Sequence, residues 1–293
     1  MEHEVRTMRG RTQLFDPRQS MRRADYEIFH YRDESLSDVE VHHHDFFEVY
    51  LFLSGQVEYR VEGQLYHPQS GDLILINPME LHQPILHHGK QPYERMVLWI
   101  SKAYLEHFGG EPESLSRCFD TSLPTHSNLV HPTPSQREQL QALMEALAQE
   151  RSGGDYASSL CAEGILMQFL VLVNRLALRA PQEASAPEET PALISQVLSY
   201  INDHYQEELS LELLAQRFYV SKYHLSHTFS KVVGTSIYRY IILKRLMIAK
   251  QLLQSGASPG TVYASCGFGD YANFYRAFKS QYGISPSDCS GEK

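Results

Sequence analysis

The sequence lacks the features that mark secreted, disulfide-bonded and membrane-spanning chains. Its four cysteines stand far apart with no C-x-x-C pair, which excludes a disulfide framework and a thiolate zinc site. The first twenty residues contain no apolar stretch after their charges, as a secretory signal would. The longest apolar run, Gly164 to Leu178, falls short of the roughly 20 residues that span a bilayer and includes Arg175. We therefore expect a cytoplasmic protein without membrane contact, in which this run forms a buried helix.

Catalytic motifs are also missing from the sequence. It has no Ser-His-Asp set, no glycine-rich phosphate loop and no coupled pair of carboxylates, so we expect no enzyme. Hydrophobic residues make up 42% and charged residues 21%, close to the average of globular proteins. A length of 293 residues suits two domains of ordinary size, each with its own core.

Acidic residues exceed basic ones overall, but the excess is confined to one part of the chain. Residues 1–189 hold 16 basic and 28 acidic residues, whereas residues 190–293 hold 10 basic and 7 acidic ones. An acidic domain is thus followed by a mildly basic one. The basic part is the candidate for contact with nucleic acid.

The first domain, expected over residues 1–180, changes from strands to helices along its length. Between about 39 and 100, short apolar runs alternate with turn residues, a spacing typical of a sandwich or barrel. From 135 to 150 and from 156 to 178 the apolar period becomes helical. We expect an all-β barrel followed by a helical segment over about 135–179.

Residues 181–191 are rich in Pro, Ala and Glu and contain no large apolar residue, so they are predicted to be a linker. Beyond them, residues 192–293 are predicted to be all helical. Ser210 and Ser221 can each cap a short helix, and the two helices together form a helix-turn-helix. After a long helix over 237–254 the arrangement recurs, with Asp270 as the cap, at an offset of about 49 residues.

The C-terminal third resembles the AraC/XylS transcription regulators over roughly residues 195–288. The residues that carry the resemblance are Leu214, Ala215, Ser221, Leu225, Phe229, Gly234, Arg245, Leu246, Ala249, Leu252, Leu253, Gly267, Phe268, Phe274, Arg276, Phe278, Lys279, Gly283, Ser285 and Pro286. Such regulators place the second helix of each unit in successive segments of the DNA major groove. Pro259 departs from the family pattern, so we expect the first helix of the second unit to be shorter or differently packed.

The resemblance and the exposed helix faces together predict eight DNA contacts. Arg276 is the strongest candidate, because a guanidinium can pair with guanine through two hydrogen bonds. His227 and Ser230 stand where the family usually has cations, which predicts weaker phosphate attraction in the first unit. The predicted contacts are Lys222, Tyr223, Ser226 and His227 in the first unit and Tyr271, Asn273, Arg276 and Lys279 in the second.

The N-terminal domain is similar to the cupin barrel in the spacing His42-x-His44-x3-Glu48, with His82 further on. In cupins such residues converge on a metal, and imidazoles with one carboxylate suit a first-row divalent ion. Three alternatives remain open for these four residues: they bind a small polar effector such as a sugar, they bind a divalent metal, or they satisfy one another. Tyr50, Tyr59, Tyr66 and Trp99 lie on expected strands and are further candidates for stacking on a sugar ring.

The resemblance completes the expected function. We predict an effector-responsive, sequence-specific DNA-binding regulator that activates a carbohydrate-metabolism operon, with double-stranded promoter DNA, RNA polymerase and a small polar effector as partners and no required cofactor. The alternative is a metal-dependent cupin enzyme or metal sensor with an appended DNA-binding module. Apolar residues on the helix over 156–178 predict a homodimer. They are Leu166, Phe169, Leu170 and Val173.

Overall fold

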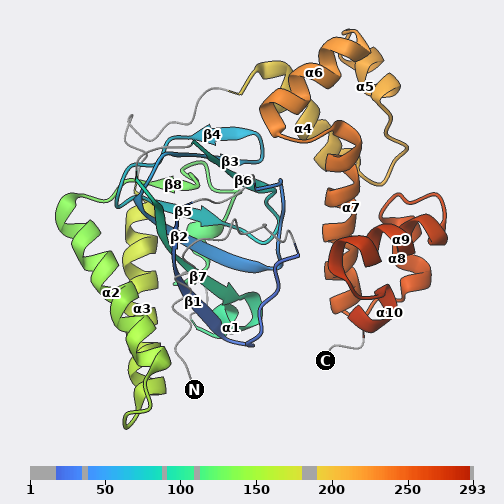
Figure 1. The fold of residues 1–293 in the computed structure, drawn as a ribbon. Helices are drawn as coiled ribbons and strands as arrows, with labels where there is room; N and C mark the ends of the chain where they lie inside the picture. The colour runs from blue at the N-terminus through green and yellow to red at the C-terminus, as the bar shows by residue number, and fades with distance from the viewer. Residues whose placement is uncertain (1–17, 35–38, 88–90, 109–112, 180–189, 291–293) are drawn as a thin grey trace. The chain divides into compact units, whose positions relative to one another are not determined.

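The computed structural model describes residues 18–34, 39–87, 91–108, 113–179 and 190–290 (Figure 1). The chain forms two compact units, the first made mostly of residues before 189 and the second mostly of residues from 189 on. Most of the predicted linker, 181–191, lies outside the described residues. The first unit is rich in sheet and the second is helical, as the sequence predicts.

Two antiparallel sheets build the first unit. The larger has the strand order β1–β7–β2–β5–β8, and the smaller has the order β4–β3–β6. Their bounds are β1 Tyr26–Asp33, β2 Phe46–Ser54, β3 Val57–Val61, β4 Gln64–Tyr66, β5 Leu73–Ile76, β6 His82–Leu86, β7 Tyr93–Ser101 and β8 Leu129–Val130.

The larger sheet separates two apolar layers, because successive side chains of a strand point to opposite faces. On β2, Tyr50 and Phe52 pack into the barrel interior, while Val49 and Leu51 pack into the layer beneath the helices. Glu48 has the same parity as Tyr50 and therefore faces the interior. This alternation positions the polar residues of the barrel.

The barrel extends beyond the predicted range of 39–100 at both ends. β1 precedes it and pairs with β7 along all eight of its residues, and β8 follows it beside β5. β6 lies within the range but was not predicted as a strand. Its sequence contains Pro84, and proline within a sheet is found mainly on edge strands, so the strand pattern here is weak. β6 is an edge strand of the smaller sheet.

Two long helices cover the outer face of the larger sheet. α2 spans Pro134–Ser152 and begins with a capping box between Thr133 and Gln136, and α3 spans Ser158–Ala177. Figure 1 shows them side by side against the sheet. Two short helical turns, α1 at Lys102–Glu106 and η1 at Arg117–Phe119, complete the unit.

α3 corrects two expectations. Its 20 residues make it long and apolar enough to cross a membrane by length and composition, contrary to the shorter run read from the sequence. One face of α3 is packed into the core of the first unit. The four residues expected at a dimer contact lie in that core and are at most 2% exposed. They are Leu166, Phe169, Leu170 and Val173, so the apolar pattern there reflects packing on the chain's own barrel.

The second unit contains two helix pairs joined by a long helix. Its elements are α4 Ala192–His204, α5 Leu211–Arg217, α6 Lys222–Val233, α7 Ile237–Gln254, α8 Pro259–Ser265, α9 Tyr271–Tyr282 and α10 Pro286–Cys289. The second pair has its own core with the C-terminal half of α7, in which Phe274 and Phe278 are fully buried. The expected shortening of α8 does not occur, because Pro259 occupies the first helical turn, where its missing N–H costs nothing.

The two pairs repeat the same turn at the end of their first helix. In the first pair Tyr219 N donates to Gln216 O and Val220 N donates to Ala215 O; in the second, Gly267 N donates to Ala264 O and Phe268 N to Tyr263 O. This is a Schellman motif, which needs one residue in the left-handed region. That residue is Gly267 with φ +81° in the second pair but Tyr219 with φ +55° in the first.

Candidate functional site

Three buried side chains converge inside the barrel. His44 precedes β2, Glu48 lies on β2 and His82 begins β6, so the convergence depends on both sheets. Oε2 of Glu48 lies 3.2 Å from Nε2 of His44 and 3.5 Å from Nε2 of His82. Trp99 Nε1, on β7, donates to the other oxygen, Oε1, at 3.0 Å. Each Glu48 oxygen therefore has its own set of neighbours.

The main chain fixes the orientation of both imidazoles. Nδ1 of His44 lies 2.8 Å from the carbonyl oxygen of Phe46, and Nδ1 of His82 lies 3.1 Å from that of Glu80. A carbonyl oxygen can only accept, so each Nδ1 carries a proton and donates. The two Nε2 atoms are thereby directed at the carboxylate. Nε2 of His82 is buried and makes no hydrogen bond.

Burial and charge shift the pKa values of this cluster in opposite directions. Burial alone would raise the pKa of Glu48, but the hydrogen bond and charge of His44, with contributions from His82 and Trp99, outweigh it and lower that pKa to about 2. Burial lowers the pKa of His82 to about 4. A carboxylate thus remains ionised inside the barrel beside an imidazole that remains neutral at pH 7.

The other predicted effector residues surround this cluster at different distances from it. The ring of His42 lies 4.2 Å from that of His82, but His42 is not among the three residues whose ligand atoms gather. Burial lowers the pKa of His42 well below its ordinary value. Tyr50 is buried and donates from its hydroxyl to that of Tyr93. Tyr59 and Tyr66 are buried in the same interior core, so neither offers a free stacking face.

Sequence reasoning missed a cation in the same interior. Arg95 Nη1, on β7, donates to Asp33 Oδ2 of β1 at 2.5 Å, and the guanidinium lies 4.3 Å from the ring centre of Tyr93. The signal was available, because Arg95 precedes Trp99 by four residues on one strand and therefore shares its face. The barrel interior holds both a carboxylate and a guanidinium.

The hypothesis of a metal site can be compared with the ligand atoms that the barrel interior offers. Among the described residues, one group of three metal-binding side chains has its ligand atoms within 4.8 Å of one another, namely His44, Glu48 and His82. Two imidazoles and a carboxylate suit a first-row divalent ion, and the carbonyl partners of Nδ1 are the usual outer neighbours of metal-bound histidines. These three residues fit such an ion.

The first helix pair presents the predicted contacts of α6 on its exposed face. Lys222, Tyr223 and His227 are exposed and Ser226 is half-buried, opposite the buried side of the helix. Lys222 is not a free cation, since its Nζ donates to Oε1 of Glu212, on α5, at 2.6 Å. Glu212 lies outside the residues that the sequence singled out, and no pattern predicts a pair ten residues apart across a turn.

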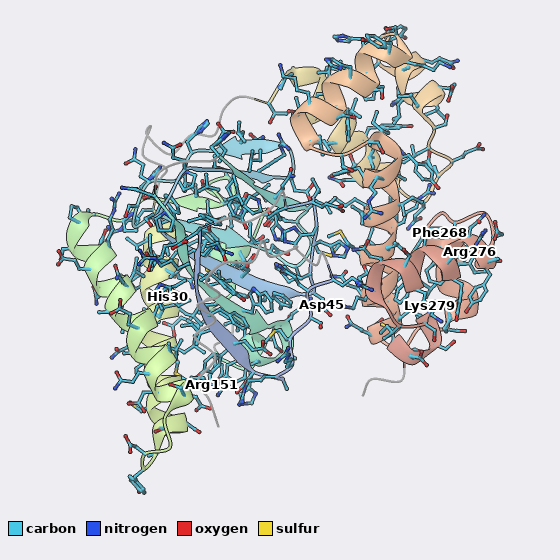
Figure 2. All side chains as sticks on the ribbon, in the orientation of Figure 1. His30, Asp45, Arg151, Phe268, Arg276 and Lys279 are labelled. Atoms are coloured by element: carbon cyan, nitrogen blue, oxygen red, sulfur yellow. The ribbon has the colours of Figure 1, made fainter. Side chains whose placement is uncertain are left out.

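The second helix pair carries a hydrogen-bonded chain along the exposed face of α9. Asp270 caps the helix by accepting from Asn273 N at 2.8 Å, and its second oxygen accepts from Asn273 Nδ2. Asn273 Oδ1 in turn accepts from Arg276 Nη2. Tyr271 and Lys279 are exposed on the same helix, and Figure 2 labels Arg276 and Lys279 there.

Comparison with known proteins agrees with both units. A family described as an AraC-like ligand binding domain matches residues 26–170, and one described as a helix-turn-helix domain matches residues 214–290. Among characterised relatives, the HTH-type transcriptional activator RhaS of Escherichia coli is 28% identical over 253 residues, covering 86% of this chain and 87% of RhaS.

Solved structures give weaker likenesses. The C-terminal domain of AraT, a response regulator from Geobacillus stearothermophilus, is 25% identical, covers 35% of this chain and 87% of that chain, and has a TM-score of 0.34. ToxT from Vibrio cholerae is 11% identical, covers 92% of this chain and 96% of its own, and has a TM-score of 0.40.

A ligand-binding barrel followed by a double helix-turn-helix defines a transcription regulator. The chain belongs to the AraC/XylS family of such regulators, with an N-terminal ligand-binding domain and a C-terminal DNA-binding domain.

Proposed function

We propose that the chain is an activator of a carbohydrate operon that responds to a sugar or sugar acid bound inside the barrel. The observation that carries the proposal is the polar lining of the interior. Glu48 and Trp99 supply an acceptor and a donor, and Arg95 supplies a cation, on neighbouring strands that face the same interior. Such a mixture of fixed donors and acceptors suits a molecule with many hydroxyl groups. The similarity to the activator RhaS supports the sign of regulation.

A thermal-unfolding panel tests the effector class. The full chain, kept in EDTA, is heated with pentoses, hexoses, deoxyhexoses and sugar acids. A ligand at a hundred times its dissociation constant stabilises the native state by about 2.7 kcal/mol. We expect one chemical group of sugars to raise the midpoint by about 5–10 °C. No shift with any sugar would contradict the proposal.

Two variants locate the effector. Trp99→Phe keeps a ring against Phe29 and Phe46 but removes the N–H that Glu48 accepts, so it should weaken the sugar shift. His30→Gln is the control, because His30 pairs with Glu94 on the surface of the same unit. Equal effects of the two variants would place the effector elsewhere.

Binding to promoter DNA is proposed to use the eight predicted contact residues of α6 and α9. Once a preferred sequence has been selected from random duplexes, Arg276→Ala should lower affinity for it by about 1–3 kcal/mol and relax the preference at one position. Equal losses on the selected and random duplexes would assign Arg276 to the phosphates. We propose that the chain acts in the cytoplasm and that it recruits RNA polymerase to that promoter.

A homodimer is proposed to form through the outer face of α3. Leu160 is 71% exposed and Met167, one heptad later, is 36% exposed, with the small Gly164 between them. Such a stripe permits close packing against the same stripe of a second copy. Sedimentation should give a dimer that Leu160→Glu dissociates, while Gln141→Glu, on the exposed side of α2, leaves it intact. A monomeric wild-type chain would contradict this part of the proposal.

A further inference from the structure

We propose that His44, Glu48 and His82 bind one first-row divalent cation through Nε2, Oε2 and Nε2, and that His42 is not a ligand. The proposal concerns the sensor domain of the proposed function but does not need the sugar. Its first support is a surplus of acceptors. The two Nδ1 atoms are committed as donors to main-chain carbonyls, so each Nε2 of a neutral ring is an acceptor directed at another acceptor, the carboxylate.

Such an arrangement needs a positive group at its centre. One proton between Nε2 of His44 and Oε2 of Glu48 can satisfy that 3.2 Å contact. It leaves the buried Nε2 of His82 without any hydrogen bond. A single cation shared by the three atoms satisfies all of them together, and buried polar atoms without partners are rare in native proteins.

The distances also suit a metal ion. Ligand atoms about 2.0–2.1 Å from a tetrahedral ion lie about 3.3–3.4 Å from each other. The two contacts of Glu48 Oε2, 3.2 and 3.5 Å, lie on either side of this value. The three ligand atoms lie within 4.8 Å of one another, and two atoms bound to one ion can be at most about 4.2 Å apart. Bringing the widest separation to about 3.4 Å takes a shortening of about 1.4 Å, which the two imidazole rings can share by small rotations.

Neighbouring residues hold the three ligand side chains in place without occupying the atoms that would bind the ion. The ring of His44 stacks on Phe46 with centres 3.9 Å apart, and Trp99 holds the oxygen of Glu48 that does not face the imidazoles. Metal-binding histidines typically donate their second nitrogen to a carbonyl, as both do here. Three protein ligands leave at least one coordination position for water or an effector oxygen.

Titration of the full chain with Co²⁺ alone tests the proposal. The chain is stripped with EDTA, dialysed, and titrated while the visible absorption of Co²⁺ and its bound amount are measured. We expect one Co²⁺ per chain, with the intense visible bands of a four- or five-coordinate site. His44→Gln, Glu48→Gln and His82→Gln should each weaken binding by more than about 100-fold, the upper end of what loss of an outer partner costs.

Two matched variants make the result decisive. His42→Gln changes a neighbouring buried imidazole, and His30→Gln removes one member of a surface histidine–carboxylate pair whose atoms lie 2.9 Å apart. Both should bind Co²⁺ within tenfold of the unchanged chain. Circular dichroism in EDTA identifies any variant that fails to fold, and the two remaining ligand variants then carry the test.

Sub-stoichiometric binding, binding unaffected by the three ligand variants, or an equal loss in His30→Gln would overturn the proposal. An equal loss in His42→Gln would overturn the three-ligand assignment. Because the sugar panel is run in EDTA and the Co²⁺ titration without sugar, failure of one proposal is visible separately from failure of the other.

Discussion

Replacing Glu212 with Gln should make the chain bind non-specific DNA more tightly and with greater sensitivity to salt. Nζ of Lys222, at the first turn of α6, donates to Oε1 of Glu212 at 2.6 Å, and both side chains are more than half exposed. On the proposed role of α6 in DNA contact, the pair keeps this cation from the DNA phosphates. Removing the carboxylate charge frees that cation without changing the size of the side chain.

The magnitude follows from counterion release. Each cation that neutralises a phosphate of duplex DNA adds about 0.9 to the slope of log affinity against log salt. Between 50 and 200 mM salt, one further contact makes the affinity fall by about 3.5-fold more. The assay is fluorescence anisotropy with a labelled random-sequence duplex at four salt concentrations. Glu207→Gln, which removes an exposed carboxylate paired with His204, controls for the change in net charge.

A double-mutant cycle decides whether the effect acts through Lys222. Lys222→Gln should lower the slope by about 0.9 when Glu212 is already Gln, and by less in the otherwise unchanged chain. An unchanged slope in Glu212→Gln, or the full effect of Lys222→Gln in both backgrounds, would refute the reasoning. Either outcome would mean that the ion pair opens at no cost when DNA approaches.

The remaining predictions concern stability and chemistry. Tyr219→Gly should raise the free energy of unfolding by about 0.5–1 kcal/mol in urea, because the left-handed conformation costs Tyr219 energy that its almost fully exposed ring does not return. Gly267→Ala, at the matching turn, should lower it by at least about 1 kcal/mol, since the added Cβ would lie 2.6 Å from Tyr205 O; equal signs for both would contradict the turn assignment. Burial alone would raise the pKa of Asp25, but hydrogen bonds from Arg23 and Arg151 outweigh it and lower that pKa to about 2. The stabilisation is complete above the unfolded-state pKa near 4 and is lost as the pH falls through 2. Asp25→Asn should therefore lower the free energy of unfolding by about 1–2 kcal/mol at pH 7, after allowance for partial exposure, and by little at pH 2. If the mutant and the unchanged chain differ in stability by the same amount at both pH values, the ion pair is not the cause. Of the four thiols, only that of Cys161 is exposed. One thiol per chain should therefore react rapidly with a thiol reagent in the native protein, and four should react in the denatured protein. Rapid reaction of a second thiol in the native protein would show that a buried cysteine becomes accessible.

The sequence alone predicted the helical unit better than the barrel. α7 spans the predicted residues 237–254, and α6 begins directly after its predicted cap, Ser221. In the structure Ser221 and Ser236 cap the two helices, and Gly234 ends α6. β8 is two residues long and forms by pairing with β5, a contact that no local pattern records. Local signals thus suffice where caps exist and fail where tertiary pairing alone makes a strand.

The candidate site divides in the same way. The resemblance of their spacing to the cupin motifs predicted that His44, Glu48 and His82 would converge, and the ligand atoms of these three residues do lie within 4.8 Å of one another. The same spacing included His42, whose ligand atom lies outside the group, and it could not show that Arg95 is paired with Asp33. Which neighbours satisfy a polar group depends on segments that are distant in sequence.

α7 fixes the spacing of the two helix pairs in the DNA-binding unit. A helix of 18 residues is about 27 Å long, and its C-terminal half contributes Leu246, Ala249 and Leu253 to the core of the second pair, while Tyr240 packs against Phe229 of the first. α7 therefore sets the distance between α6 and α9, the two helices proposed to contact DNA. An insertion of one residue in α7 would turn one recognition helix by about 100° relative to its partner. Operators of this regulator should therefore differ in sequence far more readily than in the distance between their two contact segments.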